Sequence, residues 1–446
     1  MTSLFFLVLF SPLVTVRPVA AERSVGPTWD RTFLSIDPGG GSSVEQTSDG
    51  GFIMSAQSSA EWVMKMNARG MPEWQREYGG GGNGQVSQTS DRGYIVVGGN
   101  QLLKLDHMGN VEWSRKYYLT GGMGLLSGQR TTDGGYITLG EWLPVVGGLS
   151  QAWLVRLSRT GAIEWQQAYA GQGFVEPYSV QETFDGGFVV AAGLPWNNSQ
   201  KAWVFKTDPM GRMVWQKAYS VPGEIDHHAY QVRQTSDGGY VVAADIIVFR
   251  NGAQSSVAWI LRLGPDGNIL WQKSYDGGGF VQPSSVAETS DGGFIVAGRF
   301  MPRYSSVFPF PPVGLSGPFL LRLDSAGNLV WQKIYGGAND FLFRVQETSD
   351  GGIIAVGSNV GGFHNCCNNL AWALKLDSNG NLRGCPVDVP SNATLTDTNA
   401  IVTTTTVTAV NTNAIVSSTD LTVTTPTFPS QDLCSAKTKT PVRVLR

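Results

Sequence analysis

Short apolar segments alternate with glycine-containing turns along most of this chain. In the clearest stretch, Ser284–Thr289 and Phe294–Gly298 flank an Asp-Gly-Gly turn, whereas Pro318–Leu323 and Asn328–Tyr335 flank an Asp-x-x-Gly turn. The apolar segments are rich in Val, Ile, Leu, Phe and Trp, which suit a pleated and buried surface. Glycine accepts the positive φ that tight hairpin turns require. The stretch therefore predicts four antiparallel strands, called a to d below.

The unit recurs along the chain at intervals of 42 to 59 residues. Its first turn, written Asp-Gly-Gly except for one Asp-Arg-Gly, begins at Asp49, Asp91, Asp133, Asp185, Asp237, Asp291 and Asp350. Strand repeats of this length are typical of propellers and solenoids, and a four-stranded antiparallel sheet repeated radially is a propeller blade. We therefore predict an all-β fold, a seven-bladed β-propeller with four-stranded antiparallel blades. Turn chemistry accounts for the Asp residues, and a calcium-binding Asp ring is the alternative.

A tryptophan marks strand d, four residues after the turn glycine. It occurs as Trp74, Trp113, Trp165, Trp215, Trp271 and Trp331, but the seventh unit has Gly384 at this position. The missing copy is at the other end of the chain, where Trp29–Phe33 matches Trp331–Tyr335. We expect the N-terminal strand to complete the last blade and close the ring, which would cover two sheet edges. The tryptophans are expected to pack between blades.

Composition and patterning divide the chain into three parts. Residues 1–21 contain a short apolar run before Val19-Ala20-Ala21, which predicts a secretory signal peptide and is too short to span a bilayer comfortably. Residues 27–384 hold the propeller repeats, and residues 385–446 form a Thr-rich tail. The net charge is −3, and Lys and Arg are spread over the repeats, which argues against a nucleic-acid partner.

The tail has its own repeat, and the cysteines lie at or near it. Residues 394–428 follow a seven-residue pattern rich in Thr and Val, which suits a stalk, an extra β element or a glycosylated spacer. Cys385 and Cys434 bracket this segment, so an exported chain would plausibly pair them. Cys366 and Cys367 are adjacent and form the other possible disulfide, although spacing alone does not fix the connectivity.

The candidate binding residues lie on the loops of one face. The a–b and c–d turns are short, whereas the b–c and d–a loops vary greatly in length, and one-sided insertions on a repeat scaffold often mark a binding face. Neutral drift of unconstrained loops is the alternative. The candidates are acidic, histidine and aromatic residues of these loops: Trp142, Glu176, Tyr178, Trp196, Asp226, His227, His228, Tyr304 and Asp340. Residues 224–228 (EIDHH) suit metal binding or acid–base chemistry, but no second His pair completes a ligand set, so no metal is predicted.

Two family resemblances follow from these motifs. VAETSDGGFIVAG and LRLDSAGNLVWQKIYGG resemble the repeats of a family of secreted prokaryotic β-propeller proteins, over about Trp29 to Leu382. This resemblance implies a secreted propeller and no particular activity. The LD-x-x-GN-x-x-W pattern is also similar to pyrroloquinoline quinone dehydrogenases, whose vicinal cysteines invite comparison with Cys366 and Cys367. Those propellers usually have eight blades, and no calcium-ligand or catalytic Asp motif of theirs matches here.

These observations favour a binding or scaffold module over an enzyme. The leading hypothesis is a secreted or cell-surface propeller, monomeric as a ring, that binds a protein or glycan through its loop-rich face. One alternative is an exported enzyme, either a quinone-dependent dehydrogenase with Ca²⁺ and pyrroloquinoline quinone or a glycan-active hydrolase or lyase. A further alternative is a structural component of the cell envelope. No cofactor is expected under the leading hypothesis.

Overall fold

The computed structural model describes residues 26–33, 40–57, 60–79, 84–118, 124–144, 148–170, 173–196, 199–250, 252–277, 279–302, 317–335, 340–359 and 370–382, together with short tail segments between 389 and 432. Every regular element in these ranges is a β-strand. Within the same ranges, no helix is long and apolar enough to cross a membrane. The signal-peptide prediction and all four cysteines lie outside the described residues.

Consecutive strands pair antiparallel in sets of four, which we call blades. The strands are β2 (Gly41–Gln46), β3 (Phe52–Gln57), β4 (Glu61–Met66) and β5 (Pro72–Tyr78); β6 (Gln85–Gln88), β7 (Tyr94–Gly98), β8 (Gln101–Leu105) and β9 (Val111–Tyr118); β10 (Leu125–Arg130), β11 (Tyr136–Trp142), β12 (Gln151–Leu157) and β13 (Ile163–Ala170); β14 (Glu176–Glu182), β15 (Phe188–Trp196), β16 (Ser199–Thr207) and β17 (Met213–Ser220); β18 (Asp226–Gln234), β19 (Tyr240–Arg250), β20 (Ala253–Leu263) and β21 (Ile269–Asp276); and β22 (Gly279–Glu288), β23 (Phe294–Pro302), β24 (Gly317–Leu323) and β25 (Leu329–Ile334). Single parallel bridges join β16 to β18 and β20 to β22.

The last blade combines the two ends of the repeat region. Strands β26 (Phe341–Glu347), β27 (Ile353–Asn359) and β28 (Leu370–Leu376) are followed in the sheet by β1 (Trp29–Phe33). Trp29 stands opposite Lys375, in the register that places Trp331 opposite Arg322. The N-terminal strand therefore occupies the position of strand d in this sheet.

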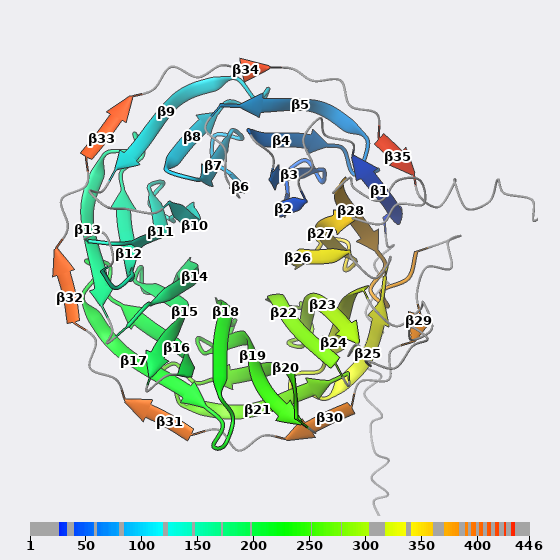
Figure 1. The fold of residues 1–446 in the computed structure, drawn as a ribbon. Helices are drawn as coiled ribbons and strands as arrows, with labels where there is room; N and C mark the ends of the chain where they lie inside the picture. Colours follow the sequence, from blue (N-terminus) through cyan, green and yellow to red (C-terminus); the bar gives the residue numbers. More distant parts are fainter. Residues whose placement is uncertain are drawn as a thin grey trace, which may run out of the picture.

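The blades are arranged around a common axis, as in a β-propeller (Figure 1). The first strand of each blade lies innermost and the fourth lies outermost (Figure 1). Buried apolar side chains fill the space between neighbouring blades, and each core cluster draws residues from two adjacent blades, as in the cluster shared by β11–β12 and β14–β16. The innermost strands therefore face a central space, which is where the site described below is found.

The predicted strands of the sixth repeat agree with the structure, but strands a and b are longer than expected. The prediction began strand a at Ser284 and ended strand b at Gly298, whereas β22 begins at Gly279 and β23 ends at Pro302. The added residues pair across the hairpin beyond a β-bulge between Pro283 and Ser285. In the Asp-Arg-Gly copy of the turn, Arg92 adopts a φ of 66°, so it takes the left-handed conformation that glycine has in the other copies.

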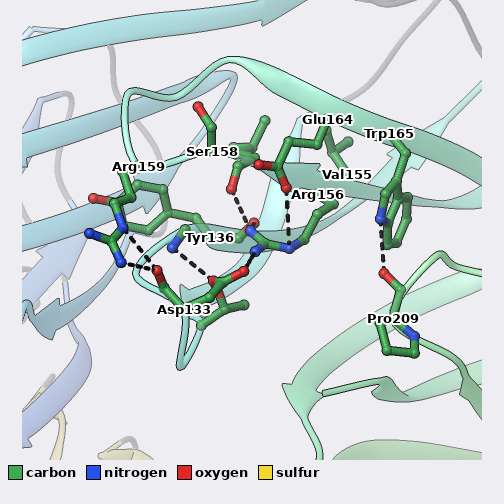
Figure 2. Close-up of polar contacts among 12 residues, drawn as sticks. Asp133, Tyr136, Val155, Arg156, Ser158, Arg159, Glu164, Trp165 and Pro209 are labelled. Atoms are coloured by element: carbon green, nitrogen blue, oxygen red, sulfur yellow. Dashed lines mark hydrogen bonds and ion pairs between the residues drawn. The ribbon is translucent and has the colours of Figure 1, made fainter.

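Each blade carries a buried cation that is fully bonded to the a–b turn, and Figure 2 shows the case of Arg156. Its guanidinium contacts the Asp133 carboxylate, donates to the carbonyls of Tyr136 (3.1 Å) and Leu157, and lies 3.7 Å from the Glu164 carboxylate. The equivalent pairs are Lys65–Asp49, Lys104–Asp91, Lys206–Asp185, Arg262–Asp237, Arg322–Asp291 and Lys375–Asp350. Many of the Lys and Arg residues that are spread over the repeats therefore have a structural role on strand c.

Aromatic residues of strand d connect neighbouring blades. Trp165 Nε1 donates to the Pro209 carbonyl at 3.0 Å (Figure 2), and the Tyr169 hydroxyl donates to the Gly211 carbonyl at 2.5 Å. Gly211 has a φ of 77°, and a Cβ there would lie 2.8 Å from the Trp165 ring. The turn therefore requires glycine for both its conformation and its contact. These contacts place the predicted tryptophans between blades.

The Thr-rich tail adds a strand to the outer edge of each blade. Its strands are β29 (Val389–Pro390) on β25, β30 (Thr394–Asp397) on β21, β31 (Ile401–Thr404) on β17, β32 (Thr408–Asn411) on β13, β33 (Ile415–Ser418) on β9, β34 (Val423–Thr424) on β5 and β35 (Ser430–Asp432) on β1. All these pairings are antiparallel, and the tail passes around the outside of the blades (Figure 1). Of the three alternatives, the pairings correspond to the extra β element.

The seven-residue sequence repeat of the tail matches the spacing of the strands that it adds to successive blades. Strands β30, β31, β32 and β33 begin at residues 394, 401, 408 and 415, so one seven-residue repeat serves one blade. Each tail strand covers N–H and C=O groups that an outer sheet edge would otherwise expose.

Candidate binding pocket at the mouth of the inner cavity

A pocket of about 610 Å³ opens where the innermost strands begin, on the face that carries the b–c and d–a loops. We call it the mouth pocket. Its side chains come from the first residues of strands a and the last residues of strands b, and the main ones are Glu141, Glu176, Tyr178, Tyr230, Gln282, Arg299, Phe341 and Phe343. The predicted loop-rich face therefore carries a pocket, and another of about 870 Å³ lies on the opposite face, among turn residues such as Asp49 and His107.

Tyr178 and Tyr230 form the aromatic wall on one side of the mouth pocket. Their rings meet edge to face with centroids 5.1 Å apart. The Tyr178 hydroxyl donates to Glu176 at 2.5 Å, and the Tyr230 hydroxyl donates to the buried Asp245 carboxylate at 3.0 Å. Burial raises the pKa of both phenols, and the neighbouring carboxylates raise it further. Both hydroxyls are therefore proton donors at neutral pH and cannot act as bases.

Phe341, Phe343 and Arg299 form another part of the pocket wall. The two phenylalanine rings are parallel, at 3° and a centroid distance of 5.9 Å, because residues two apart on β26 point to the same side. The Arg299 guanidinium lies 4.4 Å from the centroid of the Phe341 ring, within the range of a cation–π contact. Phe343 is 40% exposed, so its ring face is open to a ligand.

The two predicted histidines have different surroundings because they alternate along β18. His227 is buried; Val221 N donates to its Nε2 at 2.9 Å and its Nδ1 lies 3.3 Å from the Gln200 carbonyl. Burial lowers the pKa of His227 to about 4, so the ring is neutral and packs in the protein interior. His228 Nδ1 lies 2.9 Å from Asp245, and this bond outweighs burial and raises the pKa of His228.

The remaining predicted residues divide between the pocket and the protein interior. Glu176 and Tyr178 line the mouth pocket, whereas the Asp226 carboxylate accepts from Gln200 N at 2.6 Å. Asp340 is buried and accepts from Asn359 at 3.0 Å, and Trp142 packs against a core cluster at the end of β11. The Trp196 side chain and all of Tyr304 lie outside the described residues.

Several pocket residues were missed because strands a and b extend beyond the bounds that the turn signals predict. Tyr230, Gln282, Phe341 and Phe343 are on the extended first parts of strands a, and Arg299 is on the extended part of strand b. Aromatic residues spaced two apart, as Phe341 and Phe343 are, were the available signal. Among the described residues, no three His, Cys, Asp or Glu side chains come together as a metal-ligand set.

Below the mouth pocket lies an inner cavity of about 380 Å³ between the innermost strands. The two spaces share Gln85 and Arg344 in their linings, so they are adjacent. The charged residues that line the inner cavity are Glu45, Arg233, Glu288 and Arg344. Burial raises the pKa of Glu45 to about 7, although the Gln88 amide and the charges of Arg130 and Arg233 oppose this shift.

Solved structures similar to this chain include a β-propeller domain. The WD40 propeller domain of Doa1 has a TM-score of 0.49 and 12% identity, with 77% of this chain and 96% of that one covered. The polysaccharide lyase Uly1 has a TM-score of 0.48 and 8% identity, with 76% and 90% covered. YCF48 from Cyanidioschyzon merolae has a TM-score of 0.44 and 10% identity, with 78% and 98% covered. No protein-family model matches the chain, and no curated protein sequence does.

Proposed function

We propose that this protein is an exported, seven-bladed β-propeller that binds a glycan in the mouth pocket. Strand β1 would close the ring, and the tail would surround it. The signal-peptide pattern of residues 1–21 supports export, and the repeat count together with the pairing of β1 with β28 supports the ring. The protein would then act at the cell surface or outside the cell, as a binding module.

The aromatic lining of the mouth pocket is the observation that carries this proposal. Tyr178, Tyr230, Phe341 and Phe343 offer ring faces and edges to the apolar C–H faces of sugar rings. Glu141, Glu176, Gln282 and Arg299 stand between them and can hydrogen-bond hydroxyl groups. A concave pocket with an apolar lining and a few polar groups is the usual form of a small-ligand site.

The test is a glycan-binding measurement on the full secreted chain. We expect at least one glycan to bind saturably, and Phe343→Ala to weaken its binding by about tenfold or more because one stacking surface is lost. Phe184→Ala is the matched control, since Phe184 is 74% exposed on the a–b turn of its blade, away from the pocket. Equal loss in both variants, or no glycan binding with capture of a protein partner instead, would contradict the proposal.

A glycan-cleaving enzyme is the second candidate, and one pair of residues favours it. Burial raises the pKa of Glu141, and the charge of Glu176 raises it further, although a bond from Ser150 lowers it. A carboxyl group with a raised pKa beside a second carboxyl group is the arrangement used in glycoside hydrolysis. Product release from a bound glycan that is abolished in Glu141→Gln would favour the enzyme. Unchanged glycan after long incubation would favour binding alone.

A further inference from the structure

Neighbouring innermost strands are joined by a repeated hydrogen bond next to the inner cavity. At six junctions, a Ser or Gln side chain of one blade accepts from a backbone N–H of the next blade. The bonds are Ser43 with Val86 N, Gln85 with Gly128 N, Ser127 with Val180 N, Ser179 with Val232 N, Gln231 with Val286 N and Ser285 with Val345 N, at 2.7–3.4 Å. The repeat therefore requires a hydrogen-bond acceptor at this position.

Arg344 occupies this position at the junction between β26 and β2. A guanidinium group has five donors and no acceptor, so it cannot accept from the equivalent amide, Val44 N. The described residues provide no side-chain acceptor for that amide. This junction keeps the bonds of Gln346 with Gln46 N (3.3 Å) and of Gln46 with Ser349 N (2.7 Å), which have equivalents at other junctions. Arg344 therefore replaces a structural contact rather than providing one.

Arg233 is the second arginine of the inner cavity, and neither guanidinium is paired. The described part of the chain offers no hydrogen bond or ion pair to the side chain of Arg233 or Arg344. Burial and the positive charge of Arg233 together lower the pKa of Arg344 to about 9. The two cations are therefore close enough to repel each other, with no carboxylate bound between them.

Among the described residues, the acidic groups of the inner cavity form no ion pair with either arginine, although the charge of Glu45 opposes the lowering of the pKa of Arg233 by burial. Glu288 accepts from Ser236 N at 2.7 Å and from the Ser236 hydroxyl at 2.8 Å, which holds its carboxylate at the neighbouring junction. Glu45 accepts from Gln88 N at 3.2 Å, and its pKa of about 7 leaves it largely protonated in mildly acidic solution. Both arginines are only partly buried and line the cavity, so their guanidinium groups are open to an anion.

We propose that Arg344 and Arg233 form an oxyanion site in the inner cavity, which takes a sulfate, phosphate or carboxylate group. Guanidinium groups bind such groups with two parallel N–H···O bonds, and a low-dielectric cavity strengthens them. Because Arg344 also lines the mouth pocket, a glycan stacked on Phe343 can extend an acidic group down to the two arginines. This second step rests on the proposed function, and it identifies the glycan as an anionic one.

The first experiment measures the anion site without a glycan. Thermal unfolding of the full chain is followed with millimolar sodium sulfate against sodium chloride at equal ionic strength, because sulfate at high concentration stabilises proteins in general. We expect sulfate to raise the melting temperature of the wild type by at least about 2 °C, by linkage between binding and folding. Arg344→Gln and Arg233→Gln are each expected to remove most of this shift.

Matched controls separate a ligand site from a structural role. Arg69→Gln removes an exposed arginine from a c–d turn and should leave the sulfate shift unchanged. Arg344→Gln supplies the acceptor found at the other junctions, so it should fold at least as stably as the wild type in chloride. A sulfate shift of equal size in Arg344→Gln and Arg233→Gln would overturn the site, and so would its absence in the wild type.

The second experiment distinguishes a free anion from a glycan-borne one. Binding of a sulfated or uronate-containing glycan is compared with that of its neutral counterpart, in the wild type and in Arg344→Gln. We expect the acidic glycan to bind at least tenfold more tightly, and Arg344→Gln to remove this preference. If the sulfate-induced shift depends on the two arginines but no glycan binds, the anion site is supported and the proposed glycan function is contradicted.

Discussion

The blades, whose strands and turns we call the wall, pair their cations with carboxylates, whereas the partly exposed cations of the inner cavity have no such partner among the described residues. In the wall, Arg156 has a carboxylate and two carbonyls around its guanidinium, and the same pairing recurs from blade to blade. In the inner cavity, Arg233 and Arg344 line open space with no such partner among the described residues. Each repeat supplies a carboxylate for its own strand-c cation. Arg233 and Arg344 are not part of that pairing, and a bound anionic ligand would account for their position in the cavity.

Removing a wall carboxylate is expected to have the largest effect on stability. Asp133→Ala leaves the buried Arg156 with its carbonyl partners and the Glu164 carboxylate at 3.7 Å, and it also removes the acceptor of Gly135 N. We expect a loss of about 2 kcal/mol in the free energy of unfolding, at the low end for a buried pair because Asp133 is 65% exposed and hydrated. Urea denaturation measures it, and Asp133→Asn should lose less because it keeps an acceptor. No loss of stability in either variant would show that the Asp133–Arg156 pair does not stabilise the blade.

The inter-blade hydroxyl bonds are expected to contribute less each. Tyr169→Phe removes the bond from the buried hydroxyl to the Gly211 carbonyl and should cost about 1 kcal/mol in the free energy of unfolding. Tyr240→Phe is the control, because the described residues provide no hydrogen-bond partner for its hydroxyl, and it should change stability by only a few tenths of a kcal/mol. Equal losses in the two variants would mean that the hydroxyl bond is not what stabilises this junction.

The inner cavity is expected to respond to pH through Glu45. Its folded pKa of about 7 exceeds the ordinary value of 4.5, so the folded state keeps a proton that the unfolded state has lost. Glu45 therefore costs no stability below pH 4.5, and its cost grows as the pH rises through 7. Glu45 faces Arg130 of β10, Arg233 of β18 and the Gln88 amide of β6, all of which oppose this shift.

Thermal unfolding across this range tests the sign. Glu45→Gln should match the wild type near pH 4.5 and melt at a higher temperature at pH 8. The sulfate-induced shift of the wild type should also be larger at pH 6 than at pH 8, since protonated Glu45 no longer competes for Arg233. A wild type that becomes more stable than Glu45→Gln as the pH rises would show that Glu45 is held ionised in the folded state.

The strands and turns of the blades were predictable from the sequence, whereas most residues of the cavity were not. Turn residues such as Asp133 and strand residues such as Trp165 recur at fixed offsets, so their common role was readable from the repeat. The match between Trp29 and Trp331 likewise located the strand that pairs with β28. The tail was left open among three alternatives because a seven-residue period does not by itself reveal the outer sheet edges that receive it.

The site residues were only partly predictable because they come from different repeats. Glu176 and Tyr178 were expected on the binding face and line the pocket, whereas His227 and Asp340 point into the interior. Tyr230 and Phe343 were missed because the bulged strands a extend further than the turn signals indicated. Arg344 could not be predicted as a site residue, because the acceptor role of the equivalent Ser and Gln residues is evident only from the hydrogen bonds of the structure.

The most direct measurement compares Arg344→Gln with Arg156→Gln by urea denaturation in buffer free of sulfate and phosphate. The account predicts opposite signs. Arg156→Gln should lose about 2 kcal/mol because its carboxylate and carbonyl partners are left unpaired. Arg344→Gln should gain up to about 1 kcal/mol because a repulsive cation is replaced by an acceptor for the neighbouring blade. A loss of stability in Arg344→Gln similar to that in Arg156→Gln would contradict the distinction between wall and cavity cations.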